Sequence, residues 1–133
     1  MAKASKAKQI VVTVPNRVGA LARISNIISG VEANISAISA RGDKRRAYFH
    51  ILVDRHIRVR NALLREELPA EEEGAILLEM PNKPGRMQKV AEKIAEAGID
   101  IQYTYGSAGS GRTSFCVLKT NDDKKALKII KGK

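Results

Sequence analysis

Two turns of similar composition carry the residues best suited to binding chemistry. The first spans residues 15–21 (PNRVGAL), and the second spans residues 81–87 (PNKPGRM), 66 positions further along the chain. In each turn a glycine lacks the Cβ that would keep another group away, and the first N–H groups of a following helix have no partner inside that helix. Because such N–H groups favour negative charge, each turn is suited to hold a carboxylate.

The segments on either side of the turns have patterns that would position them. The β-branched run from Gln9 to Val14 is typical of a buried strand, and the apolar residues after each turn recur at helical spacing. These helical positions are Leu21, Ile24, Ile28 and Val31 in the first copy and Met87, Val90, Ile94 and Ala97 in the second. Each turn therefore joins a strand to an amphipathic helix.

The chain repeats itself with an offset of 66 residues and without a gap. The matching residues are Ile10 with Ile76, Pro15 with Pro81, Asn16 with Asn82, Gly19 with Gly85, Ile28 with Ile94, Ile35 with Ile101, Arg46 with Arg112, Phe49 with Phe115 and Leu52 with Leu118. Such self-similarity predicts a duplicated fold. Phe49 and Phe115 occupy equivalent places in apolar runs, so both are predicted to be core residues.

Each copy predicts a strand, a helix, a hairpin of two strands and a second helix. In the first copy the strands at 34–40 and 47–53 flank a tight reversal at Gly42, and Asp54 is expected to cap a helix that Pro69 ends. In the second copy the hairpin turns through the glycine-rich segment at 106–111. The predicted class is α+β, with two ferredoxin-like βαββαβ modules side by side, antiparallel sheets, and helices on one face.

The expected divisions are a basic flexible tail at residues 1–8, a first module at 9–73 and a second module at 74–133. Residues 71–73 favour a short edge strand that completes the first module over a solvated link. The last helix, Asp122 to about Lys131, ends the chain, so the final strand of the second module is missing. A shortened chain, a sheet completed by another subunit, or an exposed edge would each account for this, and an exposed edge would favour a homodimer.

The composition argues against catalysis. The net charge of +10 invites a nucleic-acid interpretation, but the basic residues are scattered over both ends and the middle of the chain. Cys116 is the only cysteine, and His50 and His56 are the only histidines, with no spacing typical of a triad or a zinc site. We therefore expect no catalytic residue, no metal and no cofactor. Without a long apolar run or a signal peptide, a cytoplasmic protein is predicted.

The pattern Asn-x-x-Gly-x-Leu/Met after a strand, followed by an amphipathic helix and then by Ala-Asn-Ile or Gly-Ile-Asp-Ile, resembles the ACT domain family. The resemblance covers about residues 8 to 131 in two copies, and it is to the small tandem members of that family. It implies modules packed into a continuous sheet and an amino-acid effector held at the module interface. The residues it points to are Asn16, Arg17, Val18, Gly19, Ala20, Leu21, Asn34 and Ile35 in the first copy and Asn82, Lys83, Pro84, Gly85, Arg86, Met87, Asp100 and Ile101 in the second.

In this interpretation N–H groups after Gly19 or Gly85 take the effector's carboxylate, and an asparagine oxygen or Asp100 accepts from its ammonium. The expected function is that of a non-catalytic regulator that passes its ligand state to a partner metabolic enzyme. The alternative is a basic, ferredoxin-like nucleic-acid-binding module. A third possibility is a small ligase or transferase, for which Cys116 and His50 offer the reactive side chains.

Overall fold

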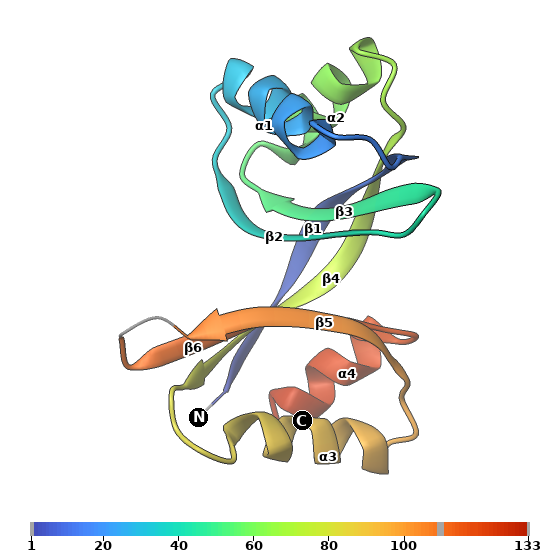
Figure 1. The fold of residues 1–133 in the computed structure, drawn as a ribbon. Helices are drawn as coiled ribbons and strands as arrows, with labels where there is room; N and C mark the ends of the chain where they lie inside the picture. The colour runs from blue at the N-terminus through green and yellow to red at the C-terminus, as the bar shows by residue number, and fades with distance from the viewer. Residues whose placement is uncertain (1, 109–110, 133) are drawn as a thin grey trace. The chain divides into compact units, whose positions relative to one another are not determined.

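The computed structural model describes residues 2–108 and 111–132, and its chain divides into two compact units (Figure 1). The first unit is Lys8–Glu73. The second unit is Gly74–Lys133 together with Met1–Ala7. Two long strands, β1 (Lys3–Pro15) and β4 (Ala70–Pro81), contribute to both units.

The first unit is a four-stranded sheet with two helices. Its remaining elements, in chain order, are α1 (Ala20–Gly30), β2 (Ile35–Gly42), β3 (Arg46–Val53) and α2 (His56–Arg65). The strand order is β2-β3-β1-β4, and the register of the antiparallel pairs places Phe49 opposite Val12 and Ala40. This is the predicted βαββαβ arrangement. Residues 71–73 lie in a strand, as predicted, but it is not a short edge strand, because β4 continues to Pro81 and has β1 and β6 as neighbours.

One face of this sheet carries both helices and the core between them (Figure 1). Alternate residues of β1 and β3 point inward, as a period of two requires, and meet the apolar stripes of α1 and α2. The most deeply buried side chains are Ile10, Val12, Phe49, Ile51, Ile24, Ile28, Val59 and Leu63. One continuous apolar core therefore holds β1 and β3 against α1 and α2.

The second unit repeats this arrangement with β4 as its first strand. The following elements are α3 (Arg86–Glu96), β5 (Ile101–Ala108), β6 (Thr113–Thr120) and α4 (Asp123–Ile130). β4 neighbours β6, β6 neighbours β5, and both pairs are antiparallel. Its core contains Ile76, Leu78, Met80, Val90, Ile94, Leu118 and Leu127. The predicted α+β, ferredoxin-like tandem fold is confirmed.

Two predictions are wrong: that residues 1–8 form a flexible tail, and that the second module lacks its last strand. Residues 3–8 lie in β1, the neighbour of β4 in the sheet, and the segment up to Ala7 belongs to the second unit. Ala2 and Ala4 pack against its core. In this segment Ala2, Ala4 and Ala7 are half-buried, whereas the lysines are exposed, so the basic composition concealed a strand whose small apolar residues face inward. Because this edge is occupied, it gives no reason to expect a homodimer.

The prediction that Phe115 is a core residue is also wrong. It is 40% exposed, whereas Phe49 is 3% exposed, as predicted. Val12 lies opposite Phe49, but the equivalent Leu78 lies opposite Cys116, one residue later than the offset of 66 requires. A shift of one residue moves every side chain of a strand to its other face, so Cys116 takes the core place and Phe115 turns outward.

Within residues 2–108 and 111–132, no helix combines the length and the apolar character needed to cross a bilayer. In the same ranges no three His, Cys, Asp or Glu side chains gather as a metal site would require.

Candidate functional site

The two predicted turns have the same backbone conformation. Gly19 precedes α1 with φ of 89°, and Gly85 precedes α3 with φ of 81°, both in the left-handed region that glycine adopts without strain. Neither helix has a side-chain hydrogen bond at its cap. Apart from the Ala20 N–H, which donates to the Arg17 carbonyl at 3.2 Å, the first N–H groups of the helices have no acceptor inside the helix and can serve a ligand or solvent.

A hollow of about 320 Å³ lies beside the first turn, and we call it the helix hollow. It is lined by Val14, Pro15, Arg17, Val18, Gly19, Ala20, Arg23, Ile24, Glu67, Leu68 and Pro69. Its volume falls at the lower end of the range for small-ligand sites, which is roughly 300–1,000 Å³. Four of the residues predicted for this turn thus line one concave surface.

The charges in the helix hollow are of both signs. Arg17 and Arg23 are positive and Glu67 is negative. Arg23 is held in place because its Nη2 donates to the Glu66 carbonyl at 3.0 Å. Arg23 and Glu67 are not part of the turn motif, and sequence reasoning missed them. The helix α2 ends at Arg65, before Pro69, and Glu67 has a left-handed φ of 62°. The only sequence signal near Glu67 is Pro69, which cannot continue a helix.

A second hollow, of about 260 Å³, lies on the hairpin side of the same turn. We call it the hairpin hollow, and its lining residues are Asn16, Arg17, Gly19, Ala20, Leu21, Ala40, Arg41, Gly42, Ala47 and Phe49. Arg41 lies over the ring of Tyr48 at 4.9 Å. The predicted Asn16 and Leu21 belong to this side of the turn, so the turn residues divide between two surfaces.

Asn16 and Asn82 attach their turns to the neighbouring hairpins. The Asn16 amide nitrogen Nδ2 donates to the Asp43 carbonyl, and its backbone N–H donates to the Arg45 carbonyl at 3.0 Å. Asn82 repeats this with donations to the carbonyls of Gly111 and Arg112 at 3.3 and 2.7 Å. One N–H of each side-chain amide therefore serves the fold, and the second N–H and the side-chain oxygen are what a ligand could use.

Asn34, Ile35, Asp100 and Ile101 lie away from the turns. Each pair starts the strand that follows the helix, so in the first unit α1 lies between Gly19 and Asn34. A helix of 11 residues is about 16 Å long. Within a unit, the structure does not bring these residues to the turn.

These residues instead close the far end of each hairpin. The Asn34 N–H donates to Asp54 Oδ1 at 2.8 Å, and the Asp100 N–H donates to Asn121 Oδ1 at 3.0 Å. The expectation that Asp54 caps α2 is wrong, because the capping residue is Arg55 and it makes no side-chain cap hydrogen bond. The carboxylate of Asp54 serves the loop before β2.

The reactive side chains considered for catalysis are poorly suited to it. Burial raises the pKa of the Cys116 thiol, although a hydrogen bond with Thr104 opposes this, so the thiol stays protonated at neutral pH. His50 is half-buried, and desolvation lowers its pKa, which keeps the imidazole neutral. Neither residue lines the helix hollow or the hairpin hollow.

Asp43 gives the first hairpin a pH-dependent element. Its Oδ1 accepts from the N–H groups of Arg45 and Arg46 at 2.8 and 2.7 Å. These hydrogen bonds, of which the one from Arg46 has the largest effect, lower the pKa of Asp43 below the usual value of 3.8. A depressed carboxyl pKa adds stability above the unfolded-state value and loses it as the pH falls through the folded-state value.

We therefore expect the difference in midpoint temperature between wild type and Asp43→Ala to be largest above pH 4 and to shrink as the pH falls toward 2. Circular dichroism melting curves at a series of pH values measure this difference. A difference that stays constant over that range would contradict a role for the ionised carboxylate.

Comparison with known proteins agrees with this geometry. The family model described as the ACT domain matches residues 8–68, which is almost all of the first unit. Over these residues the chain is similar to an ACT domain. The second unit has the same element order and strand order, with its last strand supplied by the start of β1, and is ACT-like in fold. No curated protein matches the chain.

Three solved structures show how widely this fold recurs. A protein from Bacteroides thetaiotaomicron has a TM-score of 0.90 at 21% identity, with 96% of this chain and 88% of that chain covered. The ligand-free regulatory subunit of aspartate kinase from Thermus thermophilus has a TM-score of 0.65 at 15% identity, covering 98% and 94%. Escherichia coli aspartokinase III in complex with lysine and aspartate has a TM-score of 0.58 at 13% identity, covering 97% and 31%. At these identities the likeness is one of fold, and the ACT domain is a regulatory, effector-binding type of module.

Proposed function

We propose that this chain is a non-catalytic regulatory protein and that its ACT domain binds an α-amino acid in the helix hollow. The observation that carries the proposal is the combination, in one hollow, of an uncapped helix start, cations and a carboxylate. A zwitterion requires both signs of charge close together, and an apolar surface for its side chain. Val14, Ile24 and Leu68, all buried, supply that surface.

Each part of the ligand has a matching group. The carboxylate would accept from N–H groups of the first turn of α1 and from Arg17, and Glu67 would accept from the ammonium. Each charge-assisted hydrogen bond contributes about 1.5–3 kcal/mol. Three or four of them, after the cost of ordering the ligand, give a dissociation constant in the micromolar to millimolar range.

The second turn is a weaker candidate for the same ligand. Among the residues that the structure describes, no acidic side chain lines the hollow beside it, so an ammonium group would find no negative side chain there. We therefore assign the amino acid to the first unit. This proposal gives the second unit a different role.

Support for a regulatory output comes from the neighbours in fold, among them a regulatory subunit of aspartate kinase and an aspartokinase in complex with two amino acids. If the effector binds one conformation better than another, it shifts the population toward that conformation. A partner metabolic enzyme in the cytoplasm would then respond to that conformation.

The test is a thermal-shift and calorimetric screen against the twenty amino acids, with Arg17→Gln and Lys83→Gln compared. These exposed residues are equivalent in the repeat, so both variants lose one cation from a turn. At 100 times its dissociation constant a ligand adds about 2.7 kcal/mol of stability. We expect one or a few amino acids to stabilise the wild type and Lys83→Gln, and to bind Arg17→Gln at least tenfold more weakly.

Two results would contradict the proposal. One is the absence of any shift with all twenty amino acids. The other is an equal loss of response in Arg17→Gln and Lys83→Gln, which would show that the general positive charge matters and the helix hollow does not.

The second candidate function is nucleic-acid binding, because the net charge is +10. In addition, Arg55, Arg58 and Arg65 lie together on the surface at and along α2, beside the exposed Ile57. Counterion release would make such binding fall steeply with salt. Retention of RNA or DNA at low salt that is lost at high salt supports it, and absence of retention at low salt excludes it.

A further inference from the structure

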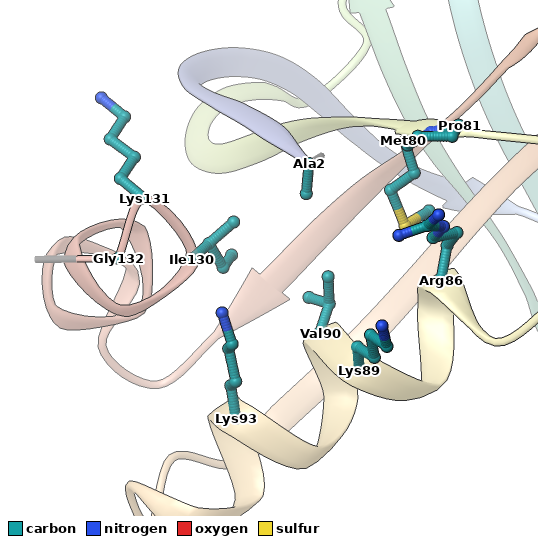
Figure 2. A pocket seen from close by; sticks show the side chains of 10 residues that line it. All are labelled: Ala2, Met80, Pro81, Arg86, Lys89, Val90, Lys93, Ile130, Lys131 and Gly132. Carbon is teal, nitrogen blue, oxygen red and sulfur yellow. The ribbon is translucent and has the colours of Figure 1, made fainter.

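The second unit has a hollow of about 290 Å³ in the place that the helix hollow occupies in the first unit (Figure 2). Its lining residues are Ala2, Met80, Pro81, Arg86, Lys89, Val90, Lys93, Ile130, Lys131 and Gly132. Five of them, Met80, Pro81, Arg86, Lys89 and Val90, stand 66 positions after residues that line the helix hollow. We call this site the cation hollow.

The cation hollow differs from its counterpart in charge. Its four ionisable lining residues, Arg86, Lys89, Lys93 and Lys131, are all positive. In the first unit Ala20 stands where Arg86 is found, and Glu67 lies near the mouth. Over residues 2–108 and 111–132, none of these four side chains forms an ion pair or a hydrogen bond. Within these ranges, none of the four charges is paired with a carboxylate.

The fold places these cations together. Arg86, Lys89 and Lys93 stand at positions i, i+3 and i+7 of α3, which puts them along one side of that helix. Lys131 comes from the end of α4, which packs against α3. Figure 2 shows Lys93 extending from α3 toward Ile130.

The carboxylates of α3 are directed elsewhere. Glu92 and Glu96 do not line the hollow, and Glu92 accepts a hydrogen bond from Gln88 Nε2 at 3.0 Å. A helix that carries charges of both signs thus turns only its cations toward this site. Such a surface raises the local concentration of anions and holds them by charge-assisted hydrogen bonds.

The floor of the cation hollow is apolar. Met80, Val90 and Ile130 are 6%, 5% and 7% exposed, and Ala2 completes the surface from the start of the chain. Figure 2 shows these side chains between the cationic ones. A bare inorganic anion would leave this floor uncovered. A ligand with an anionic head and a short apolar part would use both surfaces.

We propose that the cation hollow binds a small organic phosphate, with its phosphate group on Arg86, Lys89, Lys93 and Lys131 and its carbon skeleton on Met80, Val90 and Ile130. A phosphate carries more charge than the carboxylate of an amino acid and needs no partner for an ammonium group. The chain then has two sites of different chemistry, an amino-acid site in the first unit and a phosphate site in the second.

The probe is hexyl phosphate, titrated calorimetrically at low salt beside inorganic phosphate and hexanol. Because each CH₂ group that leaves water for the apolar floor favours binding, we expect hexyl phosphate to bind at least tenfold more tightly than inorganic phosphate. Hexanol, which lacks the charge, should not bind measurably. Equal binding of hexyl phosphate and inorganic phosphate would overturn the role of the apolar floor.

The matched variants are Lys89→Gln/Lys93→Gln and Lys124→Gln/Lys128→Gln. Both remove two exposed lysines from one helix of the second unit, and only the first pair lines the hollow. We expect the first variant to bind hexyl phosphate at least tenfold more weakly and the second to stay within twofold of wild type. An equal weakening in both would overturn the proposal, since it would show attraction by net charge alone.

A lipid is the other source of a phosphate on an apolar chain. Vesicles of phosphatidylcholine containing phosphatidic acid separate the two sources. Binding to these vesicles without binding of hexyl phosphate would overturn the proposal of a soluble ligand. Binding of hexyl phosphate with loss in Lys89→Gln/Lys93→Gln, and the same melting temperature for the two ligand-free variants, supports it.

Discussion

Gly106→Ala is expected to lower the free energy of unfolding of the second unit by about 1–3 kcal/mol, a size typical of substitutions that crowd a well-packed region. Gly106 in β5 lies opposite Cys116 in β6. A Cβ at Gly106 would come closer to the Phe115 carbonyl oxygen and to Cys116 Cβ than Cβ atoms in proteins approach other atoms. Because the first of these is a backbone atom, no side-chain rotation relieves the contact, and the two strands must move apart.

Urea unfolding followed by circular dichroism measures this effect, and Gly74→Ala is the control. Gly74 is also in a strand, and a Cβ there meets no atom within 4 Å. Its φ is not in the left-handed region. We expect Gly74→Ala to change stability by less than about 0.5 kcal/mol. Equal midpoints for Gly106→Ala and Gly74→Ala would contradict the predicted crowding between β5 and β6.

Removal of residues 1–7 is expected to unfold the second unit and to leave the first unit folded. Without this segment β4 loses part of its neighbouring strand, and the core loses the cover of Ala2 and Ala4. Each lost backbone hydrogen bond costs roughly 1 kcal/mol. The total, on the order of 3–5 kcal/mol, is comparable to the stability of a domain of this size.

Hydrogen exchange followed by NMR distinguishes the two units. In the truncated chain we expect amides of β5 and β6 to lose their protection, while amides of β2 and β3 keep theirs. The control is Lys3→Ser/Lys6→Ser in the full chain, which removes charge and retains the strand. Unchanged protection of β5 and β6 in the truncated chain would contradict the role of residues 3–7 as a strand.

Much of the fold follows from the sequence because the two copies share their strongest local signals. The left-handed glycines at 19 and 85 and the helices after them occur where the repeat predicts them. The offset of 66 fails at the second hairpin, where one residue of slip exchanges Phe115 for Cys116. Register depends on pairing across the sheet, which a local pattern does not contain.

The candidate site was predictable at the turns and not around them. Arg17, Gly19 and Ala20 line both hollows of the first unit. Glu67 and Lys131 reach their hollows through the ends of α2 and α4, which the turn motif does not describe. The residues 2–7 were misjudged because their composition is basic, although strand formation depends on alternation and on an available neighbour.

The path of β1 through both units also bears on how the protein is made. Residues 3–7 leave the ribosome more than 60 residues before Gly74, where β4, their neighbour strand, enters the second unit. The first unit has all its parts once Glu73 has been synthesised, whereas the second must close a loop of more than 60 residues. Such non-local pairing slows folding, so the first unit can fold early, while residues 3–7 stay unpaired until their part of β4 has been synthesised. For the same reason, no single cut in the chain yields two complete units.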